Sequence, residues 1–216
     1  MTPTAPPPDH VGVRPTALVL LAGVRTEIAA WVSRSVVPLA TVPLEGWTVV
    51  LGTGSTPVGA PYDDAGMLLA ARPVPPRAGP ALGFFELDGR AVVTVHGAGR
   101  RKGPTWVVWE PDLGLLRPPG LELAGPAEIT RAAGAPAEVR DELVDLLHEK
   151  RARPVTMLQA VMATLGLPGA RLLAEPARVE ELPGTTLHQP AGRQVGWFED
   201  AVADSVRLRR ELGALG

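Results

Sequence analysis

The chain has 216 residues, a formal net charge of −2 and no cysteine. This length allows one large domain or two small ones, each with a sizeable core. The absence of cysteine excludes disulfides, thiolate metal sites and cysteine nucleophiles. The small net charge gives no reason to expect nucleic acid or an anionic membrane as a partner.

The composition is rich in alanine, glycine and proline, and arginine far outnumbers lysine. This bias is typical of a GC-rich bacterial genome. We therefore expect a bacterial, cytoplasmic protein, because no signal-peptide pattern or membrane-length apolar run is visible.

The first half of the chain predicts a flexible Pro-rich leader over residues 1–14, followed by short strands and one helix. Apolar runs at 17–21, 47–51 and 67–71 are typical of buried strands. Between the first two, helical spacing predicts a helix from an N-cap at Thr26 to a stop at Pro38. A Pro-rich link, 73–80, leads into the next part of the sheet.

Residues 83–111 predict two consecutive β-hairpins. The pair Asp88-Gly89 lies between two apolar runs, and Asp-Gly is a strong signal for a type I′ turn. A glycine-rich and basic loop, 96–103, then separates the second strand from the strand 105–109. Three strands in meander order can hold one hydrophobic face.

Beyond Leu116 the apolar spacing becomes helical. Pro126 opens a short helix that Gly134 ends, and further helices follow from Pro136 and from about Val155. A loop-like connection covers 176–192, and an amphipathic helix follows over 197–212. We expect these middle helices to form a small bundle or a cap over the sheet.

These patterns predict an α+β fold: a mainly antiparallel sheet of five to six strands with one packed helix, followed by a C-terminal helical region. We expect the leader over residues 1–14 and the sheet domain over 15–120. A small helical bundle is expected over 121–175, and a linker with the last helix over 176–216.

Familiar catalytic and metal-binding patterns are absent from the sequence. The glycine-rich loop 52–59 contains Pro57, is followed by Pro61 and has no P-loop lysine, so we interpret it as an ordinary connection. The four histidines have no metal-ligand spacing, and the acids at 63–64 lack a calcium-loop register, so a turn and strand start is expected there. We expect no metal and no cofactor.

Residues 128–147 have the outline of a helix-turn-helix, with a glycine at the turn. The second helix, however, carries five acidic residues against two basic ones. Phosphate repulsion would oppose its entry into a DNA groove. Nucleic acid is therefore not an expected partner of this element.

The basic hairpin tip is the sharpest local feature. Arg100, Arg101 and Lys102 lie beside His96, and such a cluster can bind an anion or an acidic partner surface. On the strand that follows, Trp106 and Trp109 have odd spacing and must point to opposite faces. We expect one to be in the core and take Trp109 as a candidate partner contact.

The last helix carries the large apolar residues Trp197 and Phe198, which are typical of interface centres. Its apolar side is predicted to contain Trp197, Phe198, Ala201, Val202, Val206 and Leu208. Packing on the chain's own sheet and packing on another chain both remain open.

Three functional hypotheses follow. The first is a non-enzymatic adaptor that binds a protein partner or associates with itself through Trp109, Trp197 and Phe198. The second is an anion- or nucleic-acid-binding module at the basic tip. The third is an enzyme whose site is assembled from distant residues, such as His96 with Asp63 or Asp64.

Overall fold

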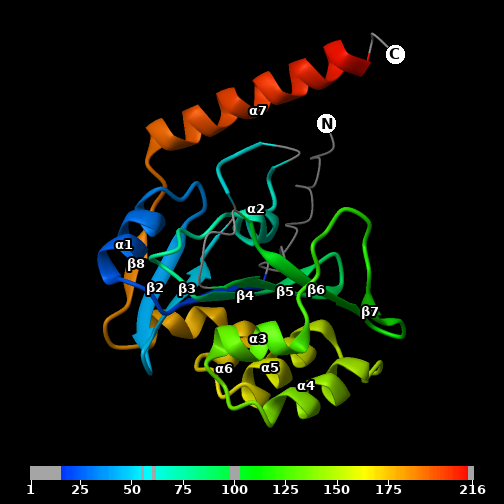
Figure 1. Cartoon of the computed structure of the whole chain (residues 1–216). Helices are drawn as coiled ribbons and strands as arrows, with labels where there is room; N and C mark the ends of the chain where they lie inside the picture. The colour runs from blue at the N-terminus through cyan, green and yellow to red at the C-terminus, as the bar shows by residue number, and fades with distance from the viewer. Residues whose placement is uncertain (1–15, 55, 60–61, 98–102, 214–216) are drawn as a thin grey trace, which may run out of the picture.

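The fold is built around one antiparallel sheet of eight strands in the order β7-β6-β5-β4-β1-β3-β2-β8 (Figure 1). The computed structural model describes residues 16–54, 56–59, 62–97 and 103–213. The strands are β1 (Ala17–Leu21), β2 (Leu39–Leu44), β3 (Trp47–Gly52), β4 (Ala81–Leu87), β5 (Arg90–His96), β6 (Thr105–Glu110), β7 (Gly114–Leu116) and β8 (Thr186–His188). Helices cover both faces, which confirms the α+β class and extends the sheet beyond the predicted five to six strands.

Two tight hairpins fix the register of the sheet. Asp88 and Gly89 join β4 to β5 with φ values of 49° and 73°, the positive angles that a type I′ turn requires. Glu45 and Gly46 repeat this geometry between β2 and β3, with φ values of 48° and 84°. The turn at Asp88-Gly89 is therefore confirmed.

The central strand β1 is buried on both faces. Leu18 and Leu20 belong to the core on one side, whereas Ala17, Val19 and Leu21 belong to the core on the other. This two-sided burial explains why the run is apolar without alternation.

Two helices cover one face: α1 (Arg25–Ser33) and α2 (Ala65–Ala71). Their core contacts include Ile28, Trp31 and Leu69. The prediction of a strand at Met67–Ala71 was wrong, because Asp64 accepts a hydrogen bond from the Met67 N–H at 3.0 Å and caps a helix there. The cap of α1 is also different from the prediction, since the N-cap residue is Val24 instead of Thr26.

The opposite face is covered by the middle helices (Figure 1). These are α3 (Pro126–Ala133), α4 (Val139–His148), α5 (Pro154–Thr164), α6 (Ala170–Ala174) and the 3₁₀ helix η1 (Pro176–Glu181). Pro126 stands at the start of α3, and Gly134 ends it with a φ of 67°, as predicted. Residues of α3–α6 and of the sheet form a single hydrophobic cluster, so these helices cap the sheet.

The segment 176–192 is more ordered than the predicted loop. It contains η1 and then β8, which pairs with β2 through Thr41 and Thr186, Ala40 and Leu187, and Leu39 and His188. The chain thus returns to the sheet edge before it leaves as the last helix, α7 (Gly192–Gly213).

The two tryptophans of β6 point to opposite faces, as predicted. Trp106 packs against the α1–α2 side, whereas Trp109 lies in the core under α3–α6. The Trp109 side chain is 1% exposed, and its indole N–H donates to the carbonyl oxygen of Glu149 at 2.8 Å. The expectation that Trp109 contacts a partner is corrected, because the side chain is part of the core.

Candidate functional site

The helix α7 is the most exposed element of the described chain. It runs past the α2 side of the molecule at a distance from the sheet (Figure 1). None of its residues belongs to either hydrophobic core cluster. Internal contacts support it instead: Arg207 forms ion pairs with Asp204 at 3.0 Å and with Glu211 at 4.0 Å, at helical spacing.

One face of α7, the inner face, is turned toward the body of the protein. It contains the half-buried residues Val195, Phe198, Val202 and Val206. The Phe198 ring meets the Tyr62 ring edge to face, with centroids 5.8 Å apart. Aromatic pairs in this geometry contribute about 0.5–1.5 kcal/mol beyond the area they bury. This contact holds the first half of α7 against the loop that precedes α2.

Two open clefts lie along the inner face. A cleft of about 680 Å³ lies between Val58 and Gly59 and the C-terminal half of α7. A second, of about 530 Å³, is lined by Thr56, Pro57 and the start of α7. Glu199 borders both clefts. The helix therefore rests on the body through a narrow set of contacts.

The opposite face, the outer face of α7, presents apolar side chains to solvent. Trp197 is 60% exposed and Leu208 is 56% exposed, and the small residue Ala201 is exposed between them. The guanidinium of Arg193 lies over the Trp197 ring at 4.4 Å. The single apolar side predicted from sequence is thus two faces, because Trp197 and Phe198 are neighbours in sequence and cannot point the same way on a helix.

Charge is divided along α7. Glu199, Asp200 and Asp204 are acidic, and Arg207, Arg209 and Arg210 follow them toward the C-terminal end. Asp200 has no ion-pair partner among the residues that the structure describes. Glu199, Arg207 and Arg210 also line the first cleft, so part of this charge borders the inner face. An exposed outer surface with two apolar anchors and charged residues of both signs beside them is suited to binding another protein surface.

Of the basic hairpin tip, only His96 lies within the described residues; Arg100, Arg101 and Lys102 lie outside them. Burial lowers the pKa of His96 to about 4. The imidazole is therefore neutral near pH 7 and adds no positive charge to the tip.

The possible pairing of His96 with Asp63 or Asp64 gains no support. The Asp64 carboxylate is engaged as the cap of α2. Within the described ranges, no hydrogen bond or ion pair joins His96 to either acid. The same ranges contain no group of three or more histidine, aspartate and glutamate side chains that could hold a metal ion.

Arg72 is a half-buried cation that no sequence pattern indicated. Its guanidinium stacks on Trp31 at 4.1 Å and donates to the Trp31 carbonyl oxygen. One terminal nitrogen, Nη1, is buried and has no hydrogen-bond partner among the described residues. Burial and the nearby charge of Arg34 lower the pKa of Arg72 to about 10. The stacking attaches the end of α2 to α1, and the buried position of Nη1 leaves a ligand no access to it.

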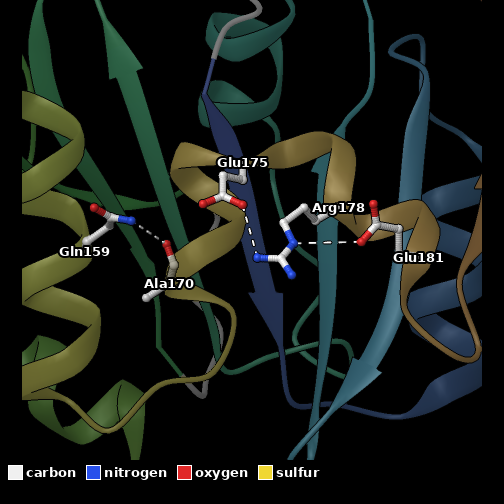
Figure 2. Close-up of polar contacts among 5 residues, drawn as sticks. All are labelled: Gln159, Ala170, Glu175, Arg178 and Glu181. Carbon is white, nitrogen blue, oxygen red and sulfur yellow. Dashed lines mark hydrogen bonds and ion pairs between the residues drawn. The ribbon is translucent and has the colours of Figure 1, made fainter.

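A third cleft, of about 600 Å³, opens beside α6 and η1. Its lining includes Leu44 of β2 and Leu172 of α6, with Leu167 before α6 and Leu182 directly after η1. Arg171, Arg178 and Glu181 line it as well. Figure 2 shows that Arg178 lies between Glu175 and Glu181, at 3.1 and 3.8 Å, and that Gln159 donates to the carbonyl oxygen of Ala170 at 3.1 Å. The Arg178 charge is already balanced, so these contacts stabilise the junction of α5, α6 and η1.

None of the helices in the described part of the chain is long and apolar enough to cross a membrane. Comparison with protein-family models, with curated proteins and with solved structures finds no match. The role of α7 must therefore be inferred from the exposure, contacts and charges of its own residues.

Proposed function

We propose that this chain is a non-enzymatic adaptor of the bacterial cytoplasm, and that it acts through a protein–protein contact on the outer face of α7. The observation that carries the proposal is the exposure of Trp197 and Leu208 on a helix that contributes nothing to the core. Tryptophan is among the residues most enriched where binding energy concentrates. The absence of cysteine is compatible with the cytoplasmic assignment.

The surroundings of Trp197 favour the interpretation that its side chain anchors a partner, and not that it is an ordinary surface residue. Its ring is stacked by Arg193 on one side, and cation–π stacking restricts its rotamers before a partner arrives. A side chain that is already ordered loses less entropy on binding. The acidic and basic blocks on the same helix would orient the partner.

A photo-reactive phenylalanine analogue at position 197 tests the proposal. In the native cells, irradiation is expected to give a discrete covalent adduct with a protein, and Leu208→Glu in the same chain is expected to remove most of it. Position 187 on β8 is a matched control, because Leu187 is 55% exposed and lies on the sheet edge instead of on α7. Equal adducts at 197 and 187, or none at 197, would contradict the proposed function.

A further inference from the structure

The residue spacing and the charges of the outer face of α7 favour one kind of partner. We infer that this partner is a second copy of the same chain, whose α7 lies antiparallel across the first with Trp197 of each copy against Leu208 of the other. The inference rests on the proposed function, since it names the occupant of the same surface.

Three apolar residues and one acidic residue of the outer face have the spacing of a helix–helix seam. Trp197, Ala201, Asp204 and Leu208 follow one another at intervals of four, three and four residues, as the seam positions of a two-helix pair do. An antiparallel pair centred between Ala201 and Asp204 places Trp197 opposite Leu208 at both ends. A two-fold interface requires this kind of self-complementary match.

The centre of the seam determines the direction of the second helix. In a parallel pair, Asp204 of one copy would face Asp204 of the other, and like charges would repel. In the antiparallel pair each Asp204 faces the small residue Ala201, and its carboxylate keeps its ion pair with Arg207 of its own helix at 3.0 Å.

The flanking charges support the same arrangement. Asp200 and Arg207 each immediately precede a seam residue, and in the antiparallel pair the two positions face each other across the interface. Asp200, which has no ion-pair partner in the described part of the chain, thus gains Arg207 of the second copy. The symmetry creates this charge pair twice.

The native mass of the full chain, measured by light scattering, tests the inference first. A dimer is expected, and Leu208→Glu is expected to weaken its association at least tenfold. The control Leu187→Glu, a substitution of equal exposure on β8, should leave the dimer intact. Circular dichroism of both variants checks that the fold is retained. A monomer at every accessible concentration overturns the inference, and so does a dimer that Leu208→Glu leaves unchanged.

Because the chain has no cysteine, introduced cysteines report the helix direction without background. Asp200→Cys and Arg207→Cys chains, mixed in equal amounts and oxidised, are expected to give a disulfide-linked dimer. Neither variant alone should do so efficiently, because along the antiparallel pair the two copies of position 200 lie about 7 Å apart and those of position 207 about 14 Å apart. Equal linkage in the single-variant samples would overturn the antiparallel arrangement.

The two proposals can fail separately. If the pure chain is monomeric and position 197 crosslinks to a different protein, the second copy is excluded as the occupant while the adaptor function stands. If position 197 gives no adduct in cells, the adaptor function itself fails.

Discussion

Gly83 lies in β4 at a point where the sheet has no room for a side chain. A Cβ atom added there would lie 2.4 Å from a ring carbon of Phe85 and 2.4 Å from the Thr94 hydroxyl oxygen. Both neighbours are buried and cannot move into solvent. The requirement for glycine here is steric, and it depends on Phe85 of the same strand and on Thr94, which pairs with Gly83 across the β4–β5 hairpin.

We expect Gly83→Ala to lower the free energy of unfolding by about 1–3 kcal/mol, the usual cost of an overpacked core. Urea denaturation of the variant measures this loss. Gly54→Ala is the matched control, because an added Cβ at Gly54 meets no atom within 4 Å. Equal losses in the two variants would contradict the steric explanation.

His96 makes the stability of the fold depend on pH. Its pKa is about 4 in the folded chain and 6.5 in the unfolded chain, because burial disfavours the charged form. Well above pH 6.5 both states are neutral and the contribution of His96 is constant. As the pH falls toward 4, the unfolded state binds the proton first, so stability is lost.

At pH 5 this loss amounts to about 2 kcal/mol relative to pH 7.5. We expect His96→Gln, which cannot titrate, to show a shallower decline in the free energy of unfolding between these two pH values. Urea denaturation at both pH values gives the difference for each protein. Parallel declines would show that His96 is not responsible.

At the scale of single elements, Asp64 explains why residues 65–71 form a helix. Five consecutive apolar and small residues at 67–71 fit a buried strand and a short buried helix equally well. The capping carboxylate selects the helix, and Asp64 precedes the run in the sequence. The cap therefore distinguishes a helix from the turn and strand start that the sequence pattern alone predicts.

Asp64→Ala is expected to cost about 1 kcal/mol of stability through loss of this cap. Asp64→Ser, which can still accept the Met67 N–H, should recover most of it. Asp63→Ala serves as the neighbouring control. If Asp63→Ala is as destabilising as Asp64→Ala, the effect arises from local charge and not from capping.

The elements that could be predicted are those with a local cause. The Asp88-Gly89 turn, the proline and glycine that bound α3, and the strand of Trp106 and Trp109 each carry their signal within a few residues. The strand β8 does not: Thr186–His188 is a three-residue strand, and its pairing partner is β2, far earlier in the chain. The same applies to the site, where the apolar residues of α7 were predictable but their division between two faces depends on the loop that Phe198 contacts.

At the scale of the whole molecule, α7 is separable from the folded body. The two core clusters consist of residues from the sheet, from α1–α6 and from η1, with neighbouring loops. The helix adds four half-buried apolar side chains, the half-buried Gln194 and one aromatic contact. The core therefore lies outside α7, whereas the proposed partner contact lies on it.

Deletion of residues 192–216 is expected to change the free energy of unfolding by no more than about 1–2 kcal/mol, since only a few half-buried contacts are removed. Denaturant unfolding of the full chain and the deletion variant tests this. A deletion variant that is unfolded or molten at room temperature would show that α7 is part of the folding unit.

The position of β8 has a consequence during synthesis. β2 is made early, but the strand that covers its outer edge is made last among the strands of the described chain. At about 5–20 residues per second, roughly 10 to 30 seconds separate the two, and during that time β2 exposes an unpaired strand edge. Pro43 lies within this strand and offers no N–H to an incoming chain. Proline at this position limits edge-to-edge pairing between nascent chains until Thr186–His188 closes the sheet.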